Sequence, residues 1–133
     1  AKGKIIFIVM ESGNTYSQNH PSLKGRAMFV FSSPDKPECA FIKYDNPFDK
    51  GITEAIKKGY MVRTRADSPN NQNRSGDYTQ QQAAFASGAQ IISTDYYRPD
   101  IRYKKKPRKF KNYSTKLGEN NARVNPINTT ATY

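Results

Sequence analysis

The sequence predicts an α/β fold built from parallel strands that alternate with helices. The first observation is the run KIIFIVM at residues 4–10, because continuous Ile- and Val-rich runs are typical of strands covered on both faces in parallel sheets. The second is that shorter apolar segments and helical segments then alternate over short connections, as in βα units. The third is that most predicted strands end on a polar or charged residue.

Three strands are predicted before the first convincing helix. The polar stretch 12–25 is too short and too broken, with Pro21 inside it, to predict a helix. RAMFVF at 26–31 predicts the second strand, and CAFIKY at 39–44 predicts the third. We expect Cys39 to be a buried small hydrophobe, because a single cysteine can form neither an internal disulfide nor a cysteine-based metal site.

Two helices and two more strands complete the regular part. Residues 49–58 predict a helix with its apolar side chains on one face, and GYMVRTRAD at 59–67 predicts the fourth strand. A polar loop follows at 68–76. DYTQQQAAFAS at 77–87 predicts a second helix, and QIIST at 90–94 predicts the last strand. The glycines that stop the two helices are Gly59 and Gly88.

The fourth strand changes character at its end. Arg63 and Arg65 are two residues apart, so on a strand they share a face and project the same way. Two guanidinium groups on one face suit an anion such as phosphate. The alternative is a pair of edge arginines satisfied by nearby carboxylates.

Polar and charged residues stand where the predicted strands end. They are Glu11, Ser32, Lys43, Asp45, Arg63, Arg65, Asp67 and Asp95. Because the carboxyl ends of parallel strands meet at one rim, where α/β folds place their active sites, we expect this set to gather there. The competing interpretation is that polar residues simply resume wherever a strand ends.

Composition divides the chain at residue 97. Residues 1–97 carry 12 Lys+Arg against 9 Asp+Glu, whereas residues 98–133 carry 10 Lys+Arg and only two carboxylates. We therefore predict a folded part, 1–97, and a basic, irregular extension, 98–133. Its basic residues, with the run at 104–111 among them, are interleaved with Tyr103, Phe110 and Tyr113. Such a segment suits an anionic membrane surface or a nucleic-acid backbone, or else it is only a solvated extension.

Length leaves two architectures open. The chain has 133 residues, whereas a (β/α)8 barrel usually needs about 250. An isolated half barrel would leave two open parallel edges. Either the fold is a small open sheet, or another chain supplies the remaining strands. No run reaches the roughly 18 apolar residues of a transmembrane helix. The first four residues lead directly into a predicted strand, as expected of a mature or internally cleaved chain without a signal peptide.

Four segments of the chain are LKGRAMFVFSS at 23–33, AFIKYDNP at 40–47, GYMVRTRAD at 59–67 and FASGAQIISTDY at 85–96. In this order they resemble the C-terminal half of calcium-dependent phosphatidylinositol-specific phospholipase C-like proteins of microbes. The similarity runs in order over residues 4–97, and ARVNPIN at 122–128 is similar to the family's closing segment. VRTRAD together with SGAQ-x-x-STDY is the most specific part, while a Thr-Asp-Tyr ending on the last strand is also typical of the related glycerophosphodiester phosphodiesterases.

The resemblance implies the last four or five βα units of a TIM-type (β/α)8 barrel, completed by an N-terminal chain or segment not in this sequence. It also implies a phosphodiesterase that cleaves phosphatidylinositol-type phosphodiesters to diacylglycerol and a cyclic inositol phosphate. One histidine would act as general base and a second as general acid. The chain's single histidine, His20, does not match those motifs, so we expect this chain alone to be inactive.

The resemblance further implies Ca2+, with ligands mostly outside this chain, and a secreted or periplasmic location. The candidate substrate-binding residues are Arg63, Arg65, Lys43, Asp67, Asp95, Tyr96 and Glu11. The cations would hold phosphate, the carboxylates would accept hydrogen bonds from inositol hydroxyls, and the tyrosine would stack on the apolar face of the ring. An arginine that does not reach the pocket would pair with Asp67 or Asp95. Family members often carry Asp at the place of Glu11.

Two other functions stay open at this point. One is a glycerophosphodiester phosphodiesterase-like hydrolase, which would differ in its headgroup pocket and its products. The other is a non-catalytic basic module that binds anions or membranes. Peripheral contact with an anionic membrane is expected in preference to nucleic acid, because the implied substrate is a lipid.

Overall fold

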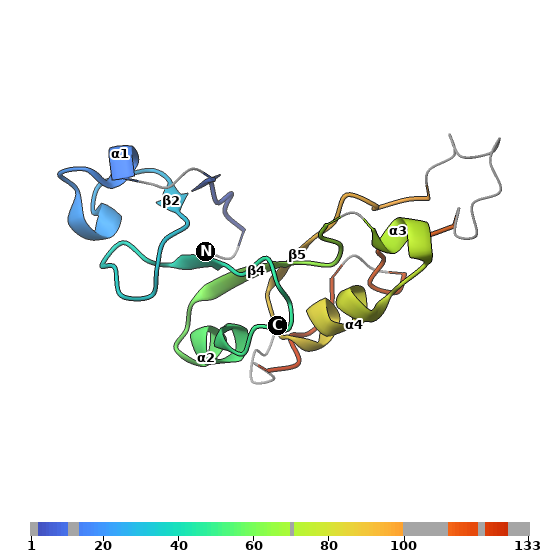
Figure 1. The fold of residues 1–133 in the computed structure, drawn as a ribbon. Coiled ribbons are helices and arrows are strands. Elements are labelled where there is room, and N and C mark those ends of the chain that lie inside the picture. The colour runs from blue at the N-terminus through green and yellow to red at the C-terminus, as the bar shows by residue number, and fades with distance from the viewer. Residues whose placement is uncertain (1–2, 11–13, 70, 100–111, 120–121, 128–133) are drawn as a thin grey trace.

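The computed structural model describes residues 3–10, 14–69, 71–99, 112–119 and 122–127. They form a mixed α/β fold with two parallel sheets (Figure 1). Such an arrangement is compatible with the predicted half barrel, which stays a prediction. Within these ranges no helix has the length and apolar character needed to cross a membrane.

Each strand lies beside the strand that precedes it in the chain. In the first sheet, β1 (Ile8–Val9) pairs in parallel with β2 (Phe29–Val30). In the second, β3 (Phe41–Lys43), β4 (Met61–Arg65) and β5 (Ile91–Ser93) pair in parallel in that order. A parallel bridge between Phe31 and Phe41 connects the two sheets. The strands therefore follow chain order throughout.

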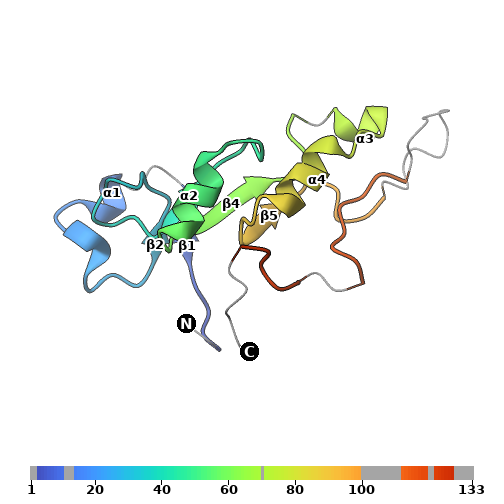
Figure 2. The same ribbon diagram turned by 90° about the horizontal axis from the view of Figure 1, so that it is seen from below.

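Within the described residues, five short helices accompany the strands. They are α1 (Asn14–Ser17), η1 (Pro21–Leu23), α2 (Gly51–Lys57), α3 (Gln72–Ser75) and α4 (Thr79–Ala86). Both α2 and α4 lie on the same face of the second sheet (Figures 1 and 2). The longer helices therefore cover one face of that sheet.

The core lies between that face and α2. Its buried residues are Ile42, Ile52, Ala55, Ile56, Val62 and Ala89. Along β4, Val62 and Thr64 are buried, whereas the residues that alternate with them, Met61, Arg63 and Arg65, are only partly buried. This alternation follows from the period of two in a strand. The predicted helix face of Ile52, Ala55 and Ile56 is confirmed, as are the third, fourth and fifth strands within a few residues.

Gly88 is required where α4 turns into β5. Its φ is +79°, which L side chains rarely adopt, and a Cβ there would lie 2.2 Å from Cδ1 of Ile127. Immediately afterwards, the Gln90 side chain accepts a hydrogen bond from the Val62 N–H at 2.8 Å and donates one to the Tyr60 carbonyl at 3.4 Å. Gln90 thus begins the β4–β5 contact with its side chain before the backbone ladder starts.

The prediction that residues 4–10 form a strand covered on both faces is wrong. Only Ile8 and Val9 form a strand, and Ile5, Phe7 and Met10 are 83%, 60% and 63% exposed. The physical reason is that β1 lies at the end of its sheet, where no other described element covers these side chains. Short helical turns also occur in two stretches predicted to be irregular, 12–25 and 68–76.

The described parts of the C-terminal extension form no helix or strand, and they pack onto the folded part. Tyr113 is only 3% exposed, and Ile127 packs against the core. The Asn125 Nδ2 group donates a hydrogen bond to the Gly88 carbonyl at 2.6 Å. The boundary at residue 98 stays a prediction, and the basic run at 104–111 lies outside the described residues.

Candidate functional site

Three cationic side chains gather at the carboxyl ends of β3 and β4. Lys43 is the register partner of Arg63 on the neighbouring strand, and Arg65 follows two residues later. Arg63 and Arg65 share the face of β4 opposite buried Val62 and Thr64. That face is the one that α2 and α4 leave open. The predicted common orientation of the two arginines is confirmed.

Each arginine is paired with a carboxylate. Arg63 Nη1 lies 2.5 Å from Asp45 Oδ1, and Lys43 Nζ lies 3.7 Å from Asp45 Oδ2. Arg65 Nη2 lies 3.2 Å from Asp95 Oδ2, and Asp95 was one of the two expected partners. The carboxylates are about half exposed, while the arginine side chains are 15% and 27% exposed. Exposed pairs of this kind contribute about 0–1 kcal/mol to stability, so their main effect is on orientation.

These ion pairs do not engage all the N–H donors of the two guanidinium groups. A guanidinium carries five N–H donors, and each pair above engages only one nitrogen. The Nε atom of Arg65 is buried and has no hydrogen-bond acceptor among the described residues. A buried donor without an acceptor costs about 1–3 kcal/mol. Because this Nε–H is buried, an additional acceptor could reach it only if the Arg65 side chain shifts.

Asp67 lies behind this rim rather than on its surface. It is fully buried, and its oxygens accept hydrogen bonds from Thr94, Asp95 and Thr115. Its carboxylate therefore points into the protein, and it pairs with neither arginine. This burial argues against direct contact between Asp67 and a substrate.

An aromatic group stands beside the end of β5. The Tyr113 ring stacks on Tyr78 with centroids 4.7 Å apart and meets the Tyr96 ring edge-on at 5.5 Å. Burial, and secondarily the negative charge of Asp67, raise the pKa of Tyr113 to about 12. Tyr96 is thus held by a protein ring. Its predicted stacking on a substrate ring stays a prediction.

The remaining candidates differ in how far the structure places them. Lys43 has a 44% exposed side chain at the open face. Glu11 lies outside the described residues. His20 lies in the connection between α1 and η1, and Figure 1 shows α1 apart from β4 and β5. No group of three or more His, Cys, Asp or Glu side chains within the described ranges could hold a metal ion.

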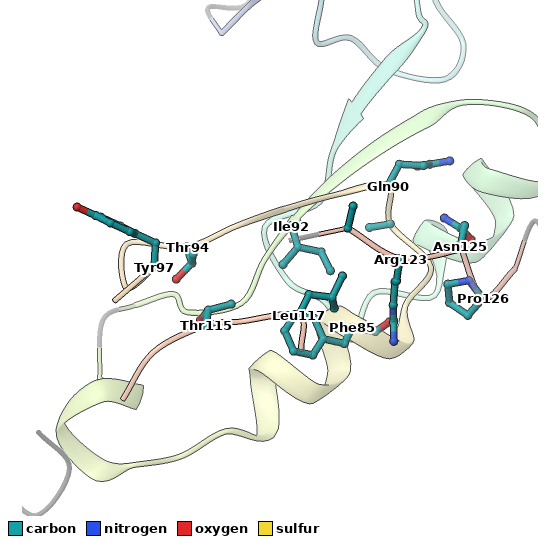
Figure 3. Close-up of a pocket in the computed structure, with 12 residues that line it drawn as sticks. Phe85, Gln90, Ile92, Thr94, Tyr97, Thr115, Leu117, Arg123, Asn125 and Pro126 are labelled. Carbon is teal, nitrogen blue, oxygen red and sulfur yellow. The ribbon is translucent and has the colours of Figure 1, made fainter. Parts of the chain in front are cut away.

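A cavity of about 490 Å3 lies on the other side of β5 (Figure 3). Ile92 faces it from β5, Thr94 faces it from just after β5, and Phe85 faces it from α4. Leu117 and Arg123 face it from the C-terminal segments. None of the predicted site residues lines it. Since β5 is last in the order β3-β4-β5, its outer edge has no strand neighbour among the described residues. The cavity therefore lies beside an open edge of the sheet.

Sequence reasoning missed several partners. Asp45 was expected at the rim but not as the partner of Arg63. The Lys43–Arg63 register is what brings them together, and no pattern in the sequence specifies it. Thr115 and Tyr113 lie in an irregular segment without any periodicity. Their contacts with Asp67 and Tyr96 could not be read from the sequence.

Comparison with known proteins gives a match to one protein family. Residues 1–126 match the model of a family described as phosphoinositide phospholipase C, Ca2+-dependent. This match confirms the resemblance inferred from GYMVRTRAD and the segments around it. No curated protein and no solved structure matches the chain at a significant level.

Proposed function

The chain belongs to the Ca2+-dependent phosphoinositide phospholipase C family, and on this premise we propose that it supplies the headgroup-binding part of a phosphodiesterase. The substrate is a phosphatidylinositol-type phosphodiester, cleaved to diacylglycerol and a cyclic inositol phosphate. The single observation that carries the proposal is the cationic face of Lys43, Arg63 and Arg65 at the carboxyl ends of β3 and β4.

The two arginines bind the phosphate group. Asp45 and Asp95 hold the guanidinium planes of Arg63 and Arg65, so these side chains need little reordering when a ligand arrives. The donors that the carboxylates leave over are directed to phosphate oxygens, since a guanidinium fork matches phosphate geometry. Hydrogen bonds between charged groups contribute about 1.5–3 kcal/mol each.

The exposed carboxylates select the headgroup. Asp95 and Asp45 are acceptors beside the phosphate position, and inositol offers hydroxyl donors around its ring. A ligand that carries both a phosphate and neighbouring hydroxyls satisfies the cations and the carboxylates together. Inorganic phosphate satisfies only the cations.

The groups that break the bond come from an N-terminal part of the same enzyme. The family chemistry needs a general base and a general acid, and the one histidine of this chain lies away from the arginines. The Ca2+ that the family description names would supply positive charge to the phosphate, and its ligands would come from outside the described residues. The described residues do not fit a calcium site, because Asp45 and Asp95 are both paired with cations. This part of the chain therefore binds and orients the headgroup.

Both ends of the strand series support such a partner. At β1 the apolar side chains of Ile5, Phe7 and Met10 face solvent. At β5 the outer edge is unpaired among the described residues and has the cavity beside it. Exposed parallel edges are a liability that closed barrels remove. An N-terminal half that adds strands at both ends covers these surfaces.

The test uses the native enzyme, isolated together with any chain that co-purifies. We expect release of cyclic inositol phosphate from phosphatidylinositol, followed by phosphorus NMR, and its loss on addition of a calcium chelator. Arg63→Ala and Arg65→Ala should each lower turnover by more than about tenfold, the order expected when charge stabilisation is lost. Arg26→Ala is the matched control, because that guanidinium lies over the Tyr16 ring, away from β4.

Several results would overturn the proposal. Near-normal turnover in both arginine variants excludes the phosphate-binding role. The absence of a co-purifying chain with two histidines excludes the enzyme for this material. Turnover of glycerophosphodiesters instead favours the related hydrolase. Salt-sensitive binding to anionic vesicles without turnover favours a binding module, because screening weakens such attraction.

A further inference from the structure

Asp67 stands where two parts of the chain meet the rim. It follows β4 directly, and its relative exposure is 0%. Its Oδ2 accepts hydrogen bonds from the Thr94 hydroxyl at 2.5 Å and from the Thr115 hydroxyl at 3.2 Å. Its Oδ1 accepts one from the Asp95 N–H at 3.1 Å. One buried carboxylate thus connects the end of β5 with the C-terminal segment.

We infer that Asp67 is a positioning residue that holds Asp95 in place for the headgroup and makes Thr115 of the C-terminal segment part of the binding site. This inference rests on the proposed function. Asp67 then does not contact the substrate itself and acts by holding the backbone of Asp95.

The turn after β5 is fixed from both sides. The Thr94 hydroxyl donates to Asp67 and accepts a hydrogen bond from the Tyr96 N–H at 2.9 Å. The Tyr96 carbonyl accepts a hydrogen bond from the Thr115 N–H at 2.8 Å. Asp95 lies between these two anchored residues. Its backbone has little freedom to move, and its side chain projects toward Arg65.

Thr115 is itself held by α4. The Gln81 Nε2 group donates to the Thr115 hydroxyl at 2.9 Å and to the Ser114 carbonyl at 3.2 Å, and Gln81 is buried. The Thr115 hydroxyl thus accepts from Gln81 and donates to Asp67. Removing it leaves a buried carboxylate oxygen with one donor fewer, and polar groups in that position cost about 1–3 kcal/mol.

The position of Asp95 affects one ligand more than another. A ligand with hydroxyls beside its phosphate contacts Asp95, whereas inorganic phosphate contacts only the arginines. Displacement of Asp95 therefore weakens binding of an inositol phosphate more than binding of inorganic phosphate, for which only the orientation of Arg65 changes. A general loss of structure weakens both ligands equally.

The experiment compares Thr115→Val with Thr115→Ser in the full chain, because Asp67→Asn risks failing to fold. NMR titrations measure affinity for inositol 1-phosphate and for inorganic phosphate, and hydrogen exchange is followed at the Asp95 amide. We expect Thr115→Val to weaken inositol phosphate roughly fivefold, the size of one lost hydrogen bond, and to leave inorganic phosphate within about twofold. Thr115→Ser should match the parent chain, and the Asp95 amide should exchange faster only in the Val variant.

The outcomes separate this inference from the proposed function. Equal weakening of both ligands, a Ser variant as weak as the Val variant, or an unchanged Asp95 exchange rate would overturn the positioning role. If the parent chain binds neither ligand, the proposed function fails. The Asp95 exchange rates then decide whether Thr115 and Asp67 hold that residue.

Discussion

Replacement of Gly88 by alanine tests how the C-terminal segment is attached to the fold. The residue has φ +79°, and a non-glycine residue there costs about 1–2 kcal/mol in backbone strain. The new Cβ would also lie 2.2 Å and 2.6 Å from Cδ1 and Cγ1 of Ile127. Ile127 must move, and it loses packing against the core of about 1–2 kcal/mol, less than the burial energy of a whole isoleucine. We expect Gly88→Ala to lower the free energy of unfolding by roughly 2–4 kcal/mol in total.

Gly59→Ala is the matched control. Gly59 also has a positive φ, +90°, but a Cβ there meets no atom within 4 Å. We expect only the strain term, about 1–2 kcal/mol. Urea unfolding followed by far-UV circular dichroism measures both variants, and their m values should match because the exposed surface is similar.

A double-mutant cycle isolates the contact with Ile127. Ile127→Ala removes the two closest atoms and leaves only its Cβ, 3.3 Å away. In that background, Gly88→Ala should cost about as much as Gly59→Ala, so the two changes are not additive. Equal costs for Gly88→Ala and Gly59→Ala in the parent chain would refute the close packing of Ile127 on this turn.

Three further predictions concern other parts of the molecule. Since the pKa of Tyr113 is raised to about 12, the unfolded chain loses this proton first, and the free energy of unfolding should fall between about pH 10 and 12. Tyr113→Phe should lack that part of the fall. Parallel pH profiles of the two proteins would contradict this role of Tyr113. Burial raises the pKa of the Cys39 thiol, so an alkylating reagent at about pH 8 should react more slowly with the folded than with the unfolded chain, and equal rates would argue against the burial. Phe7→Ser should change the free energy of unfolding by less than about 0.5 kcal/mol, because this side chain is 60% exposed, yet it should weaken co-purification with the N-terminal part; unchanged co-purification would exclude Phe7 from that contact.

The second sheet and α2 and α4 follow from local patterns. The apolar and β-branched residues of 59–67 and the apolar face of 49–58 are properties of short windows, and glycine stops mark the helix ends. The common face of Arg63 and Arg65 follows from the period of two in a strand. These features need no knowledge of which elements are neighbours.

The remaining features depend on contacts between distant segments. The pairing of Arg63 with Asp45 requires the β3–β4 register. The burial of Asp67 depends on Thr115, which is 48 residues away in an irregular segment. The run 4–10 has the composition of a covered strand, but composition cannot say whether a cover is present. That is why its burial was predicted wrongly.

The joint between the two sheets affects which part of the molecule opens first in local unfolding. The joint includes the Phe31–Phe41 bridge, a hydrogen bond from the Ser32 N–H to the Phe41 carbonyl at 3.0 Å, and contacts between phenylalanine rings. On the C-terminal side of Phe31, the Tyr60 hydroxyl also donates a hydrogen bond to the Pro34 carbonyl at 2.8 Å. The core around Val62 lies beyond it, on β3, β4 and α2. The β1–β2 pair can therefore detach in a local fluctuation that leaves this core closed, whereas amides of β4 become accessible only when the whole domain unfolds. Cleavage by a protease under native conditions should accordingly begin on the N-terminal side of Phe31.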